Sequence, residues 1–482
     1  MARHNRIAKV AAVQIAATTL QNAPAALSAI ERGIRSAAAH QAELVVLPEC
    51  AYPSYLLSSA QAYRNSGCLA ADAFLDRLAA LVREAQLHVV CGFVEDTGER
   101  LYNSAAVVGP DGELIGRYRK LFMWGADRDY FAPGAALPVF ETGVGRLGVI
   151  ICADARAPEI VAALAQQHVE LIAMPTCWVN LAQTPGEFRN PQPEFLIPAR
   201  ARELGVPFVC ANKFGMESPA IGYCGRSMIV SADGAILAEA PPVGEALITA
   251  SLTLHPSARP RLPTWTRDRI LSQQPAERPA VSAQTPMCVA VLPAALVERV
   301  EPADLFAALT ESGVEFLIGP APRRVLAEHL TIIGRSYGIT VAAWPTPQRV
   351  LFDKVGTYAW MNGEEARGFA PARSLALEGA AAIIVTHPPH DEAVLRTRAL
   401  ENRVYVFAVS NDQAQIFAPD GALLAACHQA NAPLIATVDF NQAADKTVFA
   451  GTDIWEQRQP RLYAETLAHA RKVSSARASS PV

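Results

Sequence analysis

The chain has 482 residues, of which 51% are hydrophobic and 18% are charged, so it has the composition of a folded protein with a buried core and not of a disordered chain. Its length exceeds what one ordinary core supports and therefore predicts two domains. The formal net charge is −4 and the Lys and Arg residues form no long cluster. A nucleic-acid partner is not expected, because binding phosphates needs a concentrated basic face.

The cysteines and the N-terminus bear on where the protein works. The nine cysteines show neither paired spacing nor a C-x-x-C motif, which argues against a disulfide framework or a zinc site. Residues 1–17 are basic and then apolar, but the apolar run is short and contains Gln14, so it is interpreted as a strand and not as a signal peptide. No run approaches the roughly 18 apolar residues of a membrane span. We expect a cytoplasmic protein without a membrane partner.

The first half alternates short β-branched runs with alanine-rich stretches, which is typical of an α/β fold whose helices cover its sheets. Pro110-Asp111-Gly112 predicts a hairpin, because Asp-Gly suits the positive φ of such turns. Helices are predicted at residues 23–40, 71–86, 158–167 and 194–204. Strands are predicted at residues 7–15, 44–47, 88–94, 105–108, 114–119, 148–151, 171–174, 207–211 and 227–230.

A stretch rich in Pro, Gln, Arg and Ser, at about residues 256–286, interrupts this pattern, and its second part is interpreted as a linker. After it, five segments of the first half recur in the same order, which indicates an internal duplication. The alternative is that any two halves rich in Ala and Val match somewhere. The matches set 43–49 against 315–321, 146–152 against 354–360, 199–209 against 396–406, 230–238 against 418–425, and 267–275 against 453–460.

The two copies differ at the residues that carry chemical groups. In this comparison Ala321 stands opposite Glu49, and Trp360 stands opposite Cys152. The short connection at 345–351 has no hairpin to carry an equivalent of Lys120. The second copy is therefore expected to keep the scaffold and to lack the chemistry.

Cys152 closes an apolar strand and precedes a tight turn into a helix. A helix N-terminus favours a thiolate, and such a turn leaves backbone N–H groups to face a developing oxyanion. Taken alone, a cysteine at the end of a hydrophobic strand is more often a small buried apolar residue.

Glu49 and Lys120 also follow predicted strands. Partial burial lets a strand-end carboxylate act as a base near neutral pH, although Glu49 taken alone is better explained as a cap of the next segment. A buried ammonium at Lys120 would stabilise a thiolate and a carboxylate, whereas a solvated strand end is the alternative.

Together, three motifs resemble in order and spacing those of the nitrilase superfamily, the carbon–nitrogen hydrolases: Pro48-Glu49-Cys50, Tyr118-Arg-Lys-Leu121 and GVIICADARAPE at 148–159. The likeness extends over about residues 7–275. It implies a four-layer αββα sandwich, duplicated in tandem as a pseudo-dimer. The catalytic domain would occupy 1–280, and a degenerate domain at 281–482 would lack the catalytic residues and end in a polar tail. The two domains would pair within the chain, and further homo-oligomerisation stays open.

The resemblance further implies a Glu49–Lys120–Cys152 site for a small amide-type substrate, with no metal or organic cofactor. Cys152 would attack the amide carbon, and Lys120 with the Ala153 N–H would hold the oxyanion. Glu49 would relay the proton and then activate water against the thioester. Where family members often carry a second glutamate, this chain has Asp127, whose shorter side chain either still positions these groups or reflects a reshaped pocket.

The residues after the nucleophile, Ala153-Asp-Ala-Arg156, resemble the amidase and carbamoyl-hydrolase branches more than the Trp-Glu of true nitrilases. We therefore expect hydrolysis of a non-peptide amide C–N bond that releases an acid and ammonia or an amine. Nitrile or N-carbamoyl hydrolysis, acyl transfer to an amine, and a non-catalytic metabolite-binding or scaffold role stay open. Candidate pocket walls are Tyr52, Tyr55, Trp124, Cys177 and Trp178, with Asn212 and Lys213 as further neighbours.

Overall fold

The chain divides into two compact units. The structure, a computed structural model, describes residues 5–125, 127–182, 186–255, 270, 275, 286–297, 299–320, 324–344, 350–353, 356–429 and 432–468. Unit 1 comprises Met1–Arg261, Phe449–Thr452 and Glu456–Val482, and unit 2 comprises Leu262–Val448 and Asp453–Trp455. This differs from a single boundary after residue 280, because the chain returns to the first unit near its end. Within the described ranges, no helix is long and apolar enough to cross a membrane.

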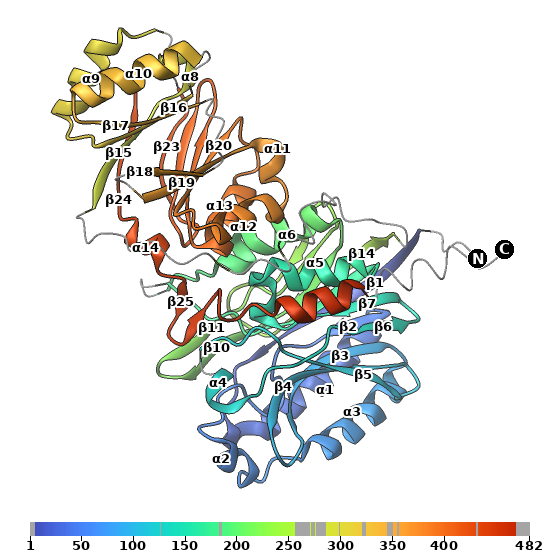
Figure 1. Cartoon of the computed structure of the whole chain (residues 1–482). Coiled ribbons are helices and arrows are strands. Elements are labelled where there is room, and N and C mark those ends of the chain that lie inside the picture. The colour runs from blue at the N-terminus through green and yellow to red at the C-terminus, as the bar shows by residue number, and fades with distance from the viewer. Residues whose placement is uncertain are drawn as a thin grey trace. The chain divides into compact units, whose positions relative to one another are not determined.

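Two sheets form the middle of the first unit (Figure 1). One has the order β11-β10-β1-β2-β3-β4-β5, with β14 also paired to β1, and the other has the order β13-β12-β9-β8-β7-β6. The strands of the first are β1 (Arg6–Ala16), β2 (Leu44–Val46), β3 (His88–Asp96), β4 (Leu101–Val108), β5 (Leu114–Arg119), β10 (Lys213–Ser218), β11 (Ile221–Cys224) and β14 (Ala246–Leu254). Those of the second are β6 (Val139–Thr142), β7 (Gly145–Val149), β8 (Leu171–Pro175), β9 (Phe208–Ala211), β12 (Met228–Val230) and β13 (Ile236–Glu239).

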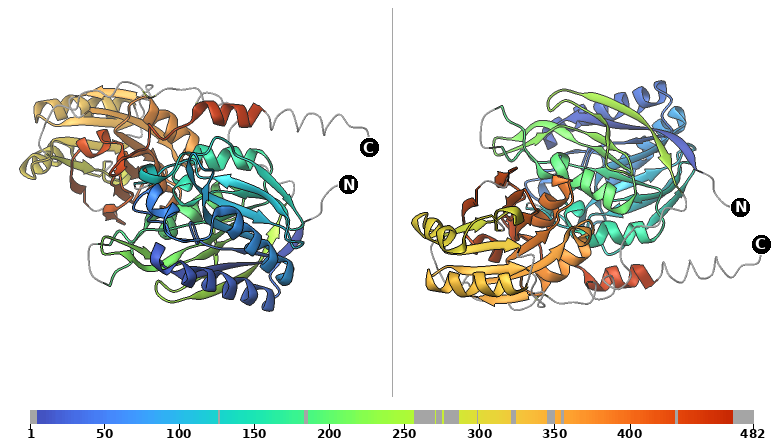
Figure 2. Two further views of the ribbon diagram at one scale, coloured as in Figure 1. Left: turned by 90° about the horizontal axis from the view of Figure 1, so that it is seen from below. Right: turned by 90° about the horizontal axis from the view of Figure 1, so that it is seen from above.

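Helices cover the outer face of each sheet. The helices α1 (Ala23–Ala39) and α3 (Ala71–Ala85) bury their apolar stripes against β1 to β4 in one core cluster. On the other side lie α5 (Pro158–Gln166) and α6 (Ile197–Leu204), and Leu164 of α5 packs against Gly148 of β7. Figure 2 shows these outer helices from two further directions. The predicted αββα order is confirmed.

All predicted helices and strands of the first half occur, with shifted ends. The strand predicted at 148–151 is β7 and ends at Val149, and the helix predicted at 194–204 begins with a π-helical turn at Gln192–Leu196. Five further strands, β6, β10, β11, β13 and the long β14, were not predicted from the sequence. Most side chains of β14 are half-exposed and show no strict alternation, so its sequence lacks the period of two that identifies a strand.

The second unit repeats this order of strands. Its sheets run β24-β15-β16-β17 and β23-β22-β21-β20-β19-β18, which parallels β14-β1-β2-β3 and β13-β12-β9-β8-β7-β6. The strands are β15 (Met287–Val291), β16 (Phe316–Pro320), β17 (Thr340–Trp344), β18 (Val350–Asp353), β19 (Gly356–Asn362), β20 (Ala382–Thr386), β21 (Tyr405–Val409), β22 (Ala414–Phe417), β23 (Leu423–Cys427) and β24 (Leu434–Val438). Its longer helices are α9 (Pro302–Glu311), α10 (Arg324–Ser336), α12 (Phe369–Leu377) and α13 (Glu392–Asn402).

Individual hydrogen bonds also recur, and they fix which positions correspond. The Lys9 N–H donates to Glu43 Oε1 at 3.0 Å, and the Cys288 N–H donates to Glu315 Oε1 at 3.3 Å, as the match of 43–49 with 315–321 requires. Ala321, opposite Glu49 in that match, lies outside the described residues. Only residues 345–349 separate β17 from β18, too few for a counterpart of the β4–β5 hairpin.

The predicted match of 146–152 with 354–360 is wrong by three residues. The bond from Glu170 N to Arg146 O recurs as Ala381 N to Thr357 O, each at 2.8 Å. The same offset places Gly363, and not Trp360, at the position of Cys152, while Trp360 lies buried within β19. A Cβ on Gly363 would lie 1.9 Å from the His387 carbonyl oxygen, so that position has no room for a side chain.

The predicted match of 199–209 with 396–406 is wrong by one residue. A buried ion pair between residues three apart joins Arg200 to Glu203 on α6, and its counterpart on α13 joins Arg398 to Glu401. Single-residue slips are hard to see in sequence, because alanine-rich helices match almost equally well in neighbouring registers.

Gly92 of β3 positions Glu49, which suggests a test. A Cβ at residue 92 would lie 2.3 Å from Pro48 O and 2.7 Å from Glu49 Cα, so Gly92→Ala must push the Glu49 backbone aside. We expect this variant to melt at a lower temperature and to lose the hydrolase activity that the sequence resemblance implies. The control is Cys91→Ala, which removes atoms from the neighbouring buried position and adds none. Wild-type activity and melting temperature in Gly92→Ala would show that the backbone contact is unimportant.

Candidate active site

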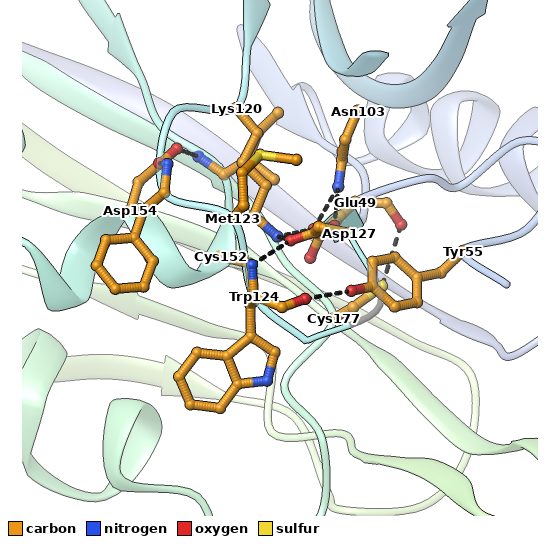
Figure 3. A network of polar contacts seen from close by, with 12 residues as sticks. Glu49, Tyr55, Asn103, Lys120, Met123, Trp124, Asp127, Cys152, Asp154 and Cys177 are labelled. Atoms are coloured by element: carbon orange, nitrogen blue, oxygen red, sulfur yellow. Dashed lines mark hydrogen bonds and ion pairs between the residues drawn. The ribbon is translucent and has the colours of Figure 1, made fainter. Parts of the chain in front are cut away.

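Three strand ends bring the predicted catalytic residues together. Glu49 follows β2, Lys120 follows β5 directly, and Cys152 follows β7. All three are buried, with exposed fractions of 0%, 2% and 7% respectively. Figure 3 shows Cys152 close to a polar network that joins Glu49 and Lys120 with Asp127, which begins the short helix α4 (Asp127–Tyr130).

The Lys120 ammonium lies between two carboxylates. Its Nζ is 2.7 Å from Glu49 Oε1 and 2.6 Å from Asp127 Oδ2. Burial by itself lowers the pKa of Lys120, but the charges of Asp127 and Glu49 outweigh it and raise that pKa well above its ordinary value. Lys120 therefore stays protonated at neutral pH and is a permanent positive charge inside the unit.

Asp127 reaches Lys120 in spite of its shorter side chain. Its Oδ2 also accepts from the Trp124 N–H at 2.7 Å, so a tight turn of backbone brings the carboxylate close enough. The Asn103 amide donates to Glu49 Oε1 at 2.7 Å and to Asp127 Oδ1 at 3.3 Å, which ties the two carboxylates together (Figure 3). The structure thus places Asp127 where it can position both Lys120 and Glu49.

The two oxygens of Glu49 differ. Oε1 accepts from both Lys120 and Asn103, whereas Oε2 has no hydrogen-bond partner among the described residues. A buried carboxylate oxygen without a donor carries a desolvation cost, so it can accept a hydrogen bond from a bound molecule.

Cys152 sits at a strained turn between β7 and α5. Its φ is +47°, in the left-handed region that a residue with a side chain rarely adopts. The 3₁₀ turn Cys152–Arg156 follows, so the first N–H groups, including that of Ala153, have no intrahelical acceptor. A backbone N–H without an acceptor, next to a thiol in sequence, is the kind of donor that stabilises an oxyanion.

The expectation that the turn favours a thiolate at Cys152 is not met, because burial works against the charged form. Burial and the nearby charge of Glu49 raise the pKa of Cys152 to about 12, although Lys120 opposes them. The turn dipoles are too weak to reverse the loss of solvation. The resting form is therefore a neutral thiol that must give up its proton during reaction.

Asp154 connects the turn of Cys152 to the chain after Lys120. Its carboxylate accepts from the N–H groups of Ile151 at 2.8 Å and Phe122 at 2.7 Å, and from the Tyr118 hydroxyl at 2.7 Å. Burial raises its pKa to about 6 while these donors lower it, so it remains mostly ionised at neutral pH. Asp154, two residues after Cys152, thus holds the turn at Cys152 and the chain after Lys120 in fixed positions relative to each other.

The structure places some of the predicted pocket-wall residues beside the site and others away from it. The Tyr55 ring lies 5.9 Å from Lys120 Nζ, and the Cys177 thiol donates to the Glu49 carbonyl at 3.2 Å, so both are neighbours of the site. Trp124 contacts the network through its backbone, since its carbonyl accepts from the Tyr55 hydroxyl at 3.2 Å. Tyr52 is not a wall residue, because its ring stacks on Phe74 in the core under α3 at 4.7 Å.

Gln192 connects the backbone of Cys152 to the side chain of Trp178. In the amide orientation that pairs both its polar atoms, Gln192 donates to the Cys152 carbonyl at 2.9 Å and accepts from Trp178 Nε1 at 3.3 Å. Sequence analysis missed Gln192, Asn103 and Asp154 as site residues. Asn103 had a usable signal, since an amide within a buried strand needs a polar partner.

Asn212 and Lys213 contact residues that surround the catalytic residues. The Asn212 side chain accepts from the Trp178 N–H at 2.7 Å. The buried Lys213 ammonium is 3.7 Å from Glu217, which itself accepts from the Tyr55 N–H at 2.8 Å. Within the described part of the chain, no group of three or more His, Cys, Asp or Glu side chains is arranged to hold a metal ion.

This site belongs to a known family of enzymes. The carbon-nitrogen hydrolase family matches residues 9–259, just over half of the chain, and that range contains every residue of the network above. The chain is therefore a member of the carbon-nitrogen hydrolase family, within the nitrilase superfamily, and is an enzyme that hydrolyses a carbon–nitrogen bond.

Named relatives include both nitrilases and amidases. A bifunctional nitrilase/nitrile hydratase of Lupinus angustifolius is 31% identical over 279 residues, covering 52% of this chain and 79% of the relative. An N-carbamoylputrescine amidase of Solanum tuberosum is 28% identical over 269 residues, covering 53% and 89%. A solved amidase from Nesterenkonia sp. matches with a TM-score of 0.46 and 25% identity, over 51% of this chain and 90% of that one.

The protonation state of Cys152 predicts how alkylation depends on pH. The thiolate is the reactive form, so the rate at which iodoacetamide modifies Cys152 should still be rising at pH 9–10, because its pKa is about 12. Glu49→Gln removes a charge that raises this pKa, so the profile should shift to lower pH. Peptide mapping separates Cys152 from the partly exposed Cys68, which serves as the internal reference. A Cys152 rate that levels off below pH 8 in the wild type would contradict the neutral resting thiol.

Proposed function

We propose that the first unit hydrolyses a small, non-peptide amide through a thioester on Cys152, releasing an acid and ammonia or an amine. The observation that carries this proposal is the state of Glu49. One of its oxygens is fixed by Lys120 and Asn103, and the other is buried without a partner among the described residues, next to a thiol that must lose its proton. A base, a nucleophile and a fixed cation are the groups that acyl transfer needs.

Acylation begins with transfer of the thiol proton from Cys152 to Glu49. As Cys152 Sγ bonds to the amide carbon, its proton moves to Glu49 Oε2, and the carbonyl oxygen becomes an oxyanion. Lys120 and the Ala153 N–H stabilise that oxygen, where a preformed charge in a water-poor site acts strongly. The C–N bond then breaks, and the leaving nitrogen takes the proton from Glu49, which leaves the thioester.

Deacylation uses the same groups in reverse. Glu49 takes a proton from water as the water oxygen bonds to the thioester carbon, and the C–S bond breaks. The sulfur recovers the proton from Glu49, and the acid departs. No step requires a metal or an organic cofactor, and Asp127 acts by holding Lys120 and the adjoining backbone in place.

The preference for an amide over a nitrile rests on the residues after the nucleophile. Ala153 leaves the space beside Cys152 unoccupied by a large side chain, and Asp154 holds the turn. N-carbamoyl hydrolysis is the second candidate, favoured by the similarity to an N-carbamoylputrescine amidase over 89% of that protein. Both reactions cleave a C–N bond at a planar carbonyl and use the same steps.

We further propose that the second unit is a degenerate copy that contributes no chemistry of its own. The repeated strand order and the recurring hydrogen bonds support a duplication. Gly363 at the nucleophile position, and a connection too short for a lysine-bearing hairpin, support the loss of catalysis. Pairing of the two units within the chain, with further association through other faces, remains part of this proposal.

Ammonia release tests the proposed reaction. The full chain is incubated with a panel of aliphatic amides, N-carbamoyl amines and nitriles, and ammonia and acid are measured. Cys152→Ala should lower turnover by a factor of at least about 10⁴, because the nucleophile is lost, with little change in melting temperature since a small residue replaces a small one. The matched control is Cys177→Ala, a neighbouring buried thiol that donates to the Glu49 carbonyl and should cost far less turnover.

The outcomes are distinct. Turnover that survives in Cys152→Ala would make Cys152 structural and the mechanism wrong. No turnover of the panel by the wild type, with reversible binding of a panel member, would favour a metabolite-binding protein. Adding hydroxylamine distinguishes hydrolysis from acyl transfer, because a transferase would form hydroxamate in place of most of the acid.

A further inference from the structure

The part of the chain that returns to the first unit lies against the loop after Lys120. We define the return segment as Phe449–Thr452 with residues 456–468, all of which belong to the first unit, and the catalytic loop as residues 121–125. The loop begins directly after Lys120 and leads to Asp127, so its backbone sets the positions of both charged groups.

Side chains hold each backbone N–H of the catalytic loop. Asp154 accepts from those of Leu121 at 3.2 Å and Phe122 at 2.7 Å, and Asp127 accepts from that of Trp124 at 2.7 Å. The other two are held from the return segment. The Met123 N–H donates to Gln457 Oε1 at 3.1 Å, and the Gly125 N–H donates to Thr452 Oγ1 at 2.8 Å.

Further contacts fix the same two segments to one another. The Gln459 amide donates to the Leu121 carbonyl at 3.3 Å, and the rings of Trp124 and Phe449 stack with centroids 5.5 Å apart. The fit is close, because a Cβ on Gly125 would lie 2.9 Å from the Phe449 ring.

The return segment also holds the helix behind the nucleophile. Arg458 Nε lies 3.1 Å from Glu159 Oε1 in an ion pair whose side chains are 3% and 0% exposed, and Glu159 stands in the first turn of α5. Thr452 and Gln457 are also buried. Buried hydrogen bonds of this kind are specific, because a buried donor left without its acceptor is strongly destabilising.

We propose that the return segment is a positioning element of the active site, in which Thr452 and Gln457 fix the catalytic loop and so place Lys120 and Asp127 against Glu49 and Cys152. This inference rests on the proposed function of the same site. It explains what the second half supplies to catalysis: no reacting group, but the segment that follows it in the chain and completes the site of the first unit.

The test compares Thr452→Val, Thr452→Ser and Gln457→Met in the full chain. Valine keeps the size of threonine and removes the hydroxyl that Gly125 needs, serine restores it, and methionine removes the acceptor for Met123. Arg461→Ala is the control, because the Arg461 side chain is 93% exposed and pairs only with exposed Glu465 among the described residues. Circular dichroism and the melting temperature check that each variant is folded.

Two readouts are measured. The first is ammonia release from the best amide of the panel, where Thr452→Val and Gln457→Met should lower kcat about tenfold with a smaller change in KM, and Thr452→Ser should recover most of it. The second is the rate of iodoacetamide modification of Cys152 against pH. Displacing Lys120 removes a charge that favours the thiolate, so the profile should move to higher pH in the first two variants and return in Thr452→Ser.

These readouts separate the inference from the proposed reaction. If the wild type hydrolyses nothing on the panel, the reaction fails, yet the alkylation profiles still decide the inference. Folded Thr452→Val and Gln457→Met with the wild-type profile would overturn it, as would equal effects of Arg461→Ala. If both buried variants fail to fold, Phe449→Leu at the half-exposed stack on Trp124 decides in their place, by the same shift or its absence.

Discussion

The structure of the site depends on one buried positive charge. The Lys120 side chain is buried, and its Nζ lies within 2.7 Å of the carboxylates of Glu49 and Asp127. The three groups must stay together, because separating them would leave unpaired buried ions. Removing one partner of such a group typically costs about 3–5 kcal/mol. The network around it follows from this constraint: Asn103 bridges the carboxylates, and a tight turn at Trp124 brings the short Asp127 side chain within reach.

The same constraint leaves the nucleophile protonated. Burial and the charge of Glu49 together outweigh Lys120 at Cys152, so the neutral thiol is the resting form. A neutral resting thiol is resistant to stray alkylation and oxidation. In the proposed mechanism, the unpaired Glu49 oxygen takes the proton only when bond formation to carbon compensates for the charge.

Sequence reasoning found the four layers, the three catalytic candidates and Asp127, because strand-end residues and motif spacing are local properties. It missed what depends on long-range packing. Asn103 and Gln192 act through partners far along the chain, and nothing near Thr452 or Gln457 indicates that they hold a loop more than 300 residues earlier. The match of Cys152 with Trp360 was wrong because the sequences of two apolar strands can be matched in several registers. The recurring backbone hydrogen bonds show that Gly363 occupies the position of Cys152.

The most direct test of the account is the mass of the intact protein after brief exposure of Glu49→Gln to the panel of amides. Glutamine cannot activate water, so the thioester should accumulate, and peptide mapping should place an acyl group on Cys152 whose mass identifies the accepted substrate. An acyl group on another residue, or an unmodified Cys152 in wild-type protein trapped by acid quench while it releases ammonia, would contradict the central claim.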